Sequence, residues 1–398
     1  MKATALRWRR SPRMGKNRNL APKGFNSLVP GVWRASTVLF DDMGNFARRK
    51  DNLYDGYTYG TTGTPTSREL EARIAVLEGG GHCVVVPSGQ AALCLTLLAF
   101  ARAGDHILIA DCAYGPLKTF AREWMQGLGV ECTFYPPSVG ADIAQLITPR
   151  TRLVMMESPG SVTMEMQDVP AIAAAAREAG AISVVDNTWA TPLGFRPLDR
   201  GVDIVVEAAS KQFGGHSDVL LGAVCTRDRA LYEKLRRSQS VIGMPVSPDD
   251  CFLVLRGLET LGVRVQAQGR AAQKVATYVA QQTEAAEVFY PPLPQARGHA
   301  LWQRDFLASG CVMSFALADG VDEKAVEAFF GAFEVFSIGA SWGGVHSLAG
   351  YYSAAEQAAR IHPVTRAAVV RLSVGLEGDE ALLADLERAF AACRASLR

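Results

Sequence analysis

The stretch Ser210-Lys211-Gln212-Phe213-Gly214-Gly215-His216-Ser217-Asp218 decides the fold class of this chain of 398 residues. An apolar run at 202–206 precedes it, and a second, glycine-flanked run at 219–222 follows it. Further upstream, the apolar run 181–185 ends at Asp186. Because short apolar runs bounded by glycine and polar residues are typical of buried strands, we expect Lys211 to follow one strand and Asp186 to end the strand before it.

This pairing of a lysine with an acid predicts a site for pyridoxal 5'-phosphate (PLP). A lysine amine can bond covalently to the PLP aldehyde, and a carboxylate can hold a proton on the pyridine nitrogen, which makes the ring an electron sink. Taken alone, Lys211 could be an ordinary surface lysine and Asp186 a simple helix cap. Together, and beside Gly214-Gly215, where a ligand can approach the backbone closely, they favour the PLP site.

The composition is typical of a globular protein with two or three domains. Hydrophobic residues make up 48% of the chain and charged residues 20%, and the net charge of +1 gives no reason to expect a nucleic-acid partner. No run of apolar residues is long enough to predict a membrane span. Residues 1–40 carry basic side chains with no acid before Asp41, which favours an N-terminal arm over an organellar transit peptide.

Cysteine and histidine spacing excludes two kinds of stabilising site. The eight cysteines are scattered without a Cys-x-x-Cys pair, which predicts a reducing, cytoplasmic location and no disulfide framework. The six histidines include no i, i+4 pair, so we expect no metal site.

Strand and helix patterns alternate through the middle of the chain. Strands are expected at 82–86, 106–110, 153–156 and 182–185, and helices at 90–101, 117–126 and 171–179. This alternation predicts an α/β fold whose mainly parallel sheet is covered by helices on both faces. Strands at 312–317 and 369–374, with helices at 321–332 and 381–391, predict a smaller α+β C-terminal domain. The expected divisions are 1–60 for the arm, 61–256 for the large domain and 257–398 for the small domain.

Two helix starts carry capping signals. Thr66-Ser67-Arg68-Glu69 matches a capping box and predicts a helix that ends at the glycines 79–81. Ser247-Pro248-Asp249-Asp250 combines a hydroxyl cap, an early proline and acids in the first turn, and predicts a long helical stretch to about Gln281.

Further candidate site residues lie where strands give way to helices. The backbone N–H groups of Gly89 and Gln90 would face an anion at a helix N-terminus, although many strand-to-helix turns contain Ser-Gly. Ser210 could offer its hydroxyl to a phosphate. Tyr114 could stack on a pyridine ring, although in isolation a tyrosine that caps the core is the favoured interpretation.

Arg371 is a candidate for substrate binding. Strand alternation places Arg371 and Ser373 on the face opposite Val370, Leu372 and Val374. A lone arginine on the polar face of a strand is usually solvated. An arginine in a ligand crevice can instead hold a carboxylate through two parallel hydrogen bonds.

From about Tyr57 to Phe390 the chain resembles the PLP enzymes of Cys/Met metabolism. These are fold type I proteins that include cystathionine synthases, cystathionine lyases and methionine γ-lyase. The resemblance is carried by Lys211 and by the strings Tyr59-Gly60-Thr61-Thr62-Gly63-Thr64-Pro65-Thr66, Leu77-Glu78-Gly79-Gly80, Glu157-Ser158-Pro159-Gly160-Ser161, Asp186-Asn187-Thr188-Trp189-Ala190, Gly215-His216-Ser217-Asp218, Ser341-Trp342-Gly343-Gly344 and Arg371-Leu372-Ser373-Val374-Gly375-Leu376-Glu377. Their common order over most of the chain makes the resemblance specific.

The resemblance implies PLP as the cofactor, a large domain of the seven-stranded type and roles for individual residues. Lys211 would bind the cofactor and move protons, Asp186 would pair with the pyridine nitrogen, and Tyr114 would stack on the ring and assist catalysis. The phosphate would be held by Gly89, Gln90, Ser210 and Tyr59, the last from a neighbouring subunit. The substrate would face Ser341, Trp342 and Arg371. The arm would therefore contact a neighbour in a homo-oligomer, expected to be a dimer of active dimers.

Two strings favour the cystathionine β-lyases within this family. Glu157-Ser158-Pro159 stands where γ-enzymes usually have Thr-Asn-Pro, and Trp342 stands where they usually have leucine. The resemblance thus implies β-elimination of L-cystathionine, a small amino-acid thioether, to homocysteine, pyruvate and ammonia in methionine biosynthesis. The alternatives are a cystathionine γ-lyase, a γ-synthase or a methionine γ-lyase. A non-catalytic PLP-binding regulator is a remote alternative that only the basic arm supports.

The chain departs from the family pattern at three positions. Thr61 replaces an arginine that is common in the phosphate arm, and Ala208 replaces a hydroxyl residue three positions before the lysine. Ser240 aligns with a tyrosine that some β-lyases place near the substrate. Phosphate binding is therefore expected to depend on backbone groups and Tyr59.

Overall fold

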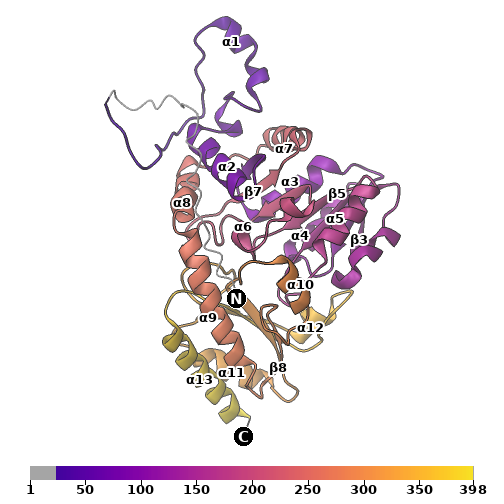
Figure 1. The fold of residues 1–398 in the computed structure, drawn as a ribbon, viewed down its shortest axis with the longest axis vertical. Helices are drawn as coiled ribbons and strands as arrows, with labels where there is room; N and C mark the ends of the chain where they lie inside the picture. Colours follow the sequence, from indigo (N-terminus) through magenta and orange to yellow (C-terminus); the bar gives the residue numbers. More distant parts are fainter. Residues whose placement is uncertain (1–23, 398) are drawn as a thin grey trace.

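The computed structural model describes residues 24–397, in which two sheets lie at opposite ends of the molecule (Figure 1). The larger sheet has seven strands in the order β1-β7-β6-β5-β4-β2-β3. Their bounds are β1 His82–Val86, β2 His106–Ala110, β3 Glu131–Tyr135, β4 Thr151–Glu157, β5 Ile182–Asp186, β6 Ile204–Glu207 and β7 Gly222–Thr226. Strands β3, β2, β4, β5 and β6 run parallel, and β7 runs antiparallel to both of its neighbours. The predicted mainly parallel α/β sheet is thus confirmed.

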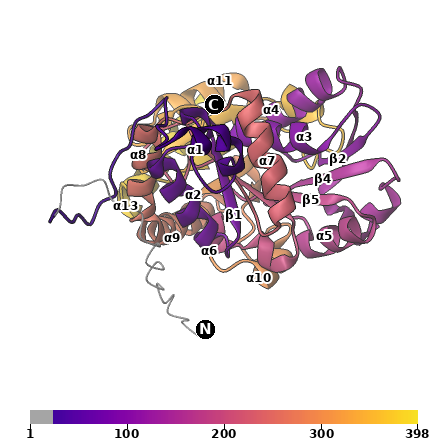
Figure 2. The same cartoon turned by 90° about the horizontal axis from the view of Figure 1, so that it is seen from above.

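Helices cover both faces of this sheet because its strands are apolar on both sides. Alternate side chains such as Ile107, Ile109 and Val206 pack with helix α3 (Gly89–Phe100) and helix α7 (Arg229–Ile242). The intervening residues Leu108 and Val154 pack against helix α5 (Val169–Glu178) in a core that continues into the smaller sheet. The short α6 (Thr191–Gly194) follows β5. Figure 2 shows the helices arranged around the sheet from above.

The smaller sheet has five strands in the order β10-β11-β12-β9-β8. Their bounds are β8 Ala285–Phe289, β9 Val312–Leu317, β10 Ser337–Ile338, β11 Leu348–Tyr352 and β12 Val369–Ser373. Helices α11 (Glu323–Gly331) and α13 (Asp379–Ser396) pack against each other, and α10 (His299–Asp305) and α12 (Ala354–Ala358) lie in the connections. Figure 1 shows α9, α11 and α13 on the same side of this sheet. The predicted α+β unit is therefore present.

Two helix predictions need correction. Helix α2 (Pro65–Leu77) begins before the expected capping box, because Thr64 is the N-cap and exchanges hydrogen bonds with Ser67. The long stretch after Ser247 is two helices, α8 (Pro248–Leu258) and α9 (Leu261–Val279), with a break at Glu259 and Thr260. The Ser247 cap itself is confirmed, since its hydroxyl accepts from the Asp249 N–H at 3.2 Å.

The helix after β2 also differs from its prediction. It begins as α4 (Gly115–Phe120) and continues into a π-helical turn at Ala121–Met125. Wider turns of this kind accommodate one extra residue within a helix. None of the helices in the described part of the chain combines the length and the apolar character needed to cross a membrane.

The N-terminal segment extends away from the body of the molecule (Figure 1). Its described part contains the one-turn helix α1 (Met43–Ala47) and exposes large apolar side chains. These are Phe25, Leu28, Val29, Leu39, Met43 and Phe46. Most of the basic residues that define the predicted arm lie outside the described residues.

Candidate active site

Lys211 lies in a tight loop between β6 and β7. The loop is closed by main-chain hydrogen bonds from Lys211 N to Ala208 O (2.9 Å) and from Gly215 N to Lys211 O (2.7 Å), and Gly215 has the left-handed φ of 75° that this turn requires. The Lys211 Nζ donates to Ser341 Oγ and lies 5.5 Å from the centre of the Trp342 ring. Burial, helped by the positive charge of Arg371, lowers the pKa of Lys211 to about 8.

Asp186 ends β5 and lies deep in the crevice near this loop. Its Oδ1 accepts hydrogen bonds from Thr188 N at 3.0 Å and Thr188 Oγ1 at 2.5 Å. Burial raises the pKa of Asp186, whereas the Thr188 hydrogen bonds and the charge of Lys211 oppose that rise. No donor among residues 24–397 reaches Oδ2, so one carboxylate oxygen is held in place and the other is free for a protonated ring nitrogen.

Tyr114 lies at the carboxyl end of the neighbouring strands, as predicted, but is held by a residue that sequence reasoning missed. The Glu157 Oε2 accepts from Tyr114 N at 2.6 Å, and parallel pairing of β4 and β5 places Glu157 beside Asp186. Burial and the charge of Asp186 raise the pKa of Glu157 well above its usual value. The signal for Glu157 was the same as for Asp186: an acid at the end of an apolar strand.

The start of helix α3 provides a second part of the site. Ser88 caps the helix by accepting from Ala91 N at 3.0 Å, and the first N–H groups, those of Gly89 and Gln90, have no acceptor within the helix. A Cβ on Gly89 would lie 2.6 Å from Ala208 Cβ. Only glycine therefore lets this helix end approach the strand that leads to Lys211.

Ser210 is engaged differently from the prediction. Its hydroxyl donates to Leu221 O at 3.0 Å and accepts from Leu221 N at 2.8 Å, which fixes the entry and exit of the Lys211 loop together. Its one hydrogen is already used within the chain, so a direct contact with a phosphate would require a protonated phosphate oxygen or a rotated hydroxyl.

Arg371 comes from β12 of the smaller sheet and faces the same crevice. Its Nη2 donates to Ser341 O at 3.1 Å, and its guanidinium carbon lies 5.1 Å from the ring centre of Tyr352. Burial lowers the pKa of Arg371, and Tyr352 and Tyr114 are the groups that oppose this effect. Tyr352 was missed because nothing in its local sequence distinguishes it from a core tyrosine.

A buried pair of acids lies behind Asp186. Glu78, which caps the end of α2, receives no hydrogen bond from an N–H group or an alcohol hydroxyl among the described residues, and Glu207 at the end of β6 accepts from Asn187 Nδ2 at 3.1 Å. Burial raises the pKa of Glu78 to about 7, opposed by a hydrogen bond with Glu207 and the charge of Arg196. Burial and the charges of Glu78 and Asp186 raise the pKa of Glu207 well above normal. Both carboxyls therefore keep their protons to a higher pH than a solvated glutamate does.

Tyr59 is the one predicted residue that the chain does not bring into this crevice on its own. It precedes the short 3₁₀ turn Gly60–Thr62, and its side chain is half exposed without a hydrogen-bond partner in the described part of the chain. The same part of the chain contains no cluster of His, Cys, Asp or Glu that would hold a metal ion.

These groups fit PLP. A lysine with a lowered pKa matches its aldehyde, a carboxylate with one free oxygen matches its ring nitrogen, and a glycine-lined helix end matches its phosphate. The three features lie at the ends of β5, β6 and α3, where ligands bind in open α/β sheets. The residues that would hold the cofactor thus belong to the large domain, and Arg371 belongs to the small one.

Comparison with known proteins shows the family of the chain. The pattern of the family described as "Cys/Met metabolism PLP-dependent enzyme" matches residues 14–391. The chain is 37% identical to cystathionine beta-lyase of Escherichia coli over 95% of this chain and 96% of that protein, and 40% identical to cystathionine beta-lyase of Bordetella avium over 91% of each. A solved structure of cystathionine gamma synthase from Xanthomonas oryzae superposes with a TM-score of 0.86 at 31% identity, covering 94% and 96% of the two chains. The chain belongs to the Cys/Met metabolism family of PLP-dependent enzymes.

Proposed function

We propose that this chain is a cystathionine β-lyase, which converts L-cystathionine and water into homocysteine, pyruvate and ammonia in methionine biosynthesis. The observation that carries the proposal is the position of the Lys211 amine, which donates to Ser341 Oγ, faces the Trp342 indole and lies within the field of Arg371. The two curated β-lyases reported above support the same substrate.

The residues of the large domain hold the cofactor and tune it. Asp186 Oδ2 would accept a hydrogen bond from the protonated ring nitrogen, Tyr114 would stack on the ring, and Gly89, Gln90 and the Ser210 loop would hold the phosphate. PLP, when bound, draws the negative charge left at the substrate Cα into its ring. Asp186 contributes because a buried, oriented carboxylate stabilises the protonated nitrogen more strongly than water would.

Lys211 is the group that moves protons. With a pKa of about 8, a useful fraction of the amine is unprotonated near neutral pH, so Nζ can accept the proton from the substrate Cα. The Lys211 Nζ then carries a proton that can be given to the sulfur of the leaving homocysteine. Ser341 Oγ, within hydrogen-bond distance, keeps the amine directed at this position.

Arg371 and Trp342 orient the substrate. Among residues 24–397 no carboxylate pairs with Arg371, and its fork of N–H groups can hold the substrate α-carboxylate through two hydrogen bonds. Fixing the carboxylate presents the Cα–H bond to Lys211 in reactive geometry. Trp342 forms an apolar wall beside the thioether.

A complete site requires a second subunit. Tyr59 lies on a segment whose described apolar side chains are exposed, and its hydroxyl would reach the phosphate of a neighbour's cofactor. The assembly is a homo-oligomer, a dimer of active dimers, in the cytoplasm. Three parts of the chain serve the site. The arm of residues 1–60 contacts the neighbouring subunit, the large domain of 61–256 holds the cofactor, and the small domain of 257–398 provides Arg371 for the substrate.

The keto acid released from L-cystathionine by the PLP-loaded protein tests the proposal. Pyruvate together with free homocysteine is the expected result. The structural likeness to cystathionine gamma synthase supports a second candidate, cleavage or formation of the Cγ–S bond. Release of 2-oxobutyrate and cysteine would show that the protein is a γ-lyase and not a β-lyase. A bound cofactor chromophore without any keto acid product would indicate a synthase or a regulator.

A further inference from the structure

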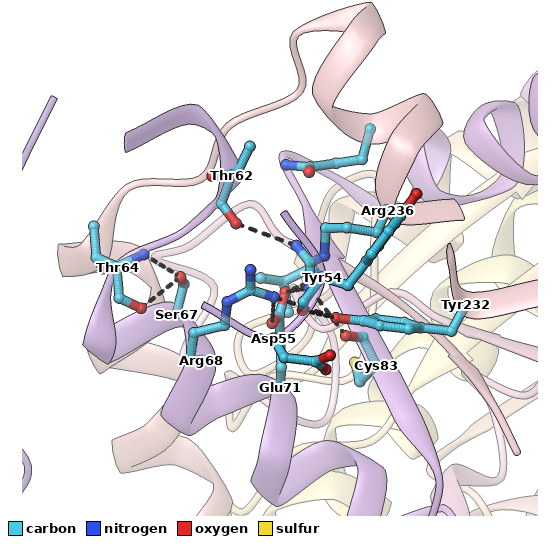
Figure 3. Close-up of polar contacts among 12 residues, drawn as sticks. Tyr54, Asp55, Thr62, Thr64, Ser67, Arg68, Glu71, Cys83, Tyr232 and Arg236 are labelled. Carbon is cyan, nitrogen blue, oxygen red and sulfur yellow. Dashed lines mark hydrogen bonds and ion pairs between the residues drawn. The ribbon is translucent and has the colours of Figure 1, made fainter. Parts of the chain in front are cut away.

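A buried charge cluster lies beneath the segment that carries Tyr59 (Figure 3). Glu71 on α2 pairs with Arg236 on α7 at 2.6 Å and with Arg68 at 3.1 Å, and the Arg236 side chain is only 1% exposed. A further Glu71 contact, from Val85 N at 3.1 Å, ties the cluster to β1. One carboxylate therefore balances two guanidinium groups inside the protein.

Several donors of this cluster, and of Tyr232 and Gln239 beside it, reach main-chain carbonyls of residues 53–62. Their bonds are Arg68 Nη2 to Leu53 O (3.4 Å) and Gly56 O (3.2 Å), Tyr232 OH to Tyr54 O (2.6 Å), Gln239 Nε2 to Thr61 O (3.0 Å) and Arg236 Nη1 to Thr62 O (3.5 Å). Figure 3 shows Arg68, Tyr232 and Arg236 converging on this segment from α2 and α7. The large domain thus holds the backbone on both sides of Tyr59.

Short-range hydrogen bonds also fix the backbone of the turn at Tyr59. Thr62 N and Thr62 Oγ1 both donate to Tyr59 O, at 3.0 and 2.8 Å. Gly60 N donates to Ser36 O at 2.8 Å, and a Cβ on Gly60 would lie 2.1 Å from Ala35 O. The position of the Tyr59 backbone is therefore determined, whereas its side chain is half exposed.

We propose that Glu71 is a positioning residue for the cofactor site of a neighbouring subunit. It holds Arg68 and Arg236 in place, these hold the carbonyls on either side of Tyr59, and Tyr59 is thereby presented to the neighbour's cofactor phosphate. Burying two guanidinium groups is costly unless a carboxylate and further acceptors compensate them, so loss of the Glu71 charge releases the segment. The inference rests on the proposed function, in which Tyr59 acts across the subunit interface.

The first test compares Glu71→Gln with Glu69→Gln, the same substitution on the same helix. In the described part of the chain, Glu69 pairs only with Arg73, at 2.9 Å, and has no contact with residues 53–62. Titration of the apo-protein with PLP should show a dissociation constant raised about tenfold to hundredfold in Glu71→Gln, because a hydrogen bond to a charged phosphate is lost. Amide hydrogen exchange across 53–62 in the apo-protein should accelerate. Unchanged values for both measurements in a folded Glu71→Gln would overturn the proposal.

If Glu71→Gln does not fold, a less disruptive variant can test the same proposal. Gln239→Met removes the donor to Thr61 O without changing charge, and should raise the PLP dissociation constant in the same direction by a smaller factor. If Gln239→Met binds PLP as the wild type does while exchange at 53–62 is faster, the segment does not act on the cofactor and the proposal is wrong.

Mixing subunits shows whether Glu71 acts across the interface. Glu71→Gln retains Lys211, and Lys211→Ala retains an intact Tyr59 segment. In an equal mixture, about a quarter of the sites combine a functional lysine with a functional segment from the partner, so PLP affinity and pyruvate formation should return at that fraction. The control mixture combines Tyr59→Phe with Lys211→Ala. If PLP affinity and pyruvate formation recover in that control but not in the mixture with Glu71→Gln, the role of Glu71 is refuted and the proposed function remains intact. If Tyr59→Phe alone leaves the PLP affinity unchanged, both the role of Tyr59 and this inference fall.

Discussion

Substitution of Arg371 should change catalytic activity strongly and protein stability only slightly. Within residues 24–397 it has no carboxylate partner; its contacts are one hydrogen bond to Ser341 O at 3.1 Å and the face of Tyr352 at 5.1 Å. A buried arginine without a counter-charge is poorly compensated, which is why its pKa is lowered. We therefore expect Arg371 to serve substrate binding and not stability.

The expected magnitudes follow from these contacts. In Arg371→Ala, the substrate carboxylate loses two charge-assisted hydrogen bonds of about 1.5–3 kcal/mol each, so kcat/KM for L-cystathionine should fall roughly 10²- to 10⁴-fold. The protein loses one hydrogen bond of about 1 kcal/mol and the contact with Tyr352, and it no longer buries an unpaired cation. The free energy of unfolding should therefore change by no more than about 1–2 kcal/mol.

The assay is steady-state pyruvate formation, with thermal unfolding measured on the same samples. Arg371→Lys is the matched control: it keeps the charge but not the planar fork, and should lie between the wild type and Arg371→Ala. A kcat/KM in Arg371→Ala within about fivefold of the wild type would remove Arg371 from the substrate site. A large loss of stability would show instead that the arginine is structural.

Two further predictions concern groups in the large domain. Lys211→Ala should abolish turnover and the covalent cofactor absorbance while PLP still binds; turnover near the wild-type rate would contradict the assignment of the base. Burial raises the pKa of Glu78 to about 7 and that of Glu207 well above its ordinary value, whereas an unfolded glutamate has a pKa of about 4.3. The stability that their protonation contributes is therefore complete below about pH 4.3 and is lost as the pH rises from there through about 7, the pKa of Glu78. Glu207→Gln should flatten the decline in melting temperature between about pH 5 and about pH 7, and an unchanged decline would show that Glu207 does not cause it.

The sequence predicted the elements that depend on local pattern. The strands β1, β2 and β9 lie at the predicted residues; Asp186 ends β5, and Lys211 follows β6, as expected. This succeeds because apolar periodicity identifies a buried strand wherever it occurs, and parallel strands bring their carboxyl ends to one edge of a sheet. The start of α2 and the break between α8 and α9 were mislocated, because several hydroxyl residues in a row can each serve as a cap and a short break hardly disturbs helical periodicity.

The sequence by itself determined the family and the cofactor, and it predicted the lysine and the acid of the site, since these depend on residue types at fixed places along strands. Only the tertiary structure decided which groups support them. The link from Glu157 to Tyr114 spans 43 positions, and that from Glu71 on α2 to Arg236 on α7 joins helices far apart in the chain. Contacts of this kind leave no local pattern, because the partners are chosen by the packing of whole elements and by the need of each buried charge for a counter-charge or a hydrogen bond.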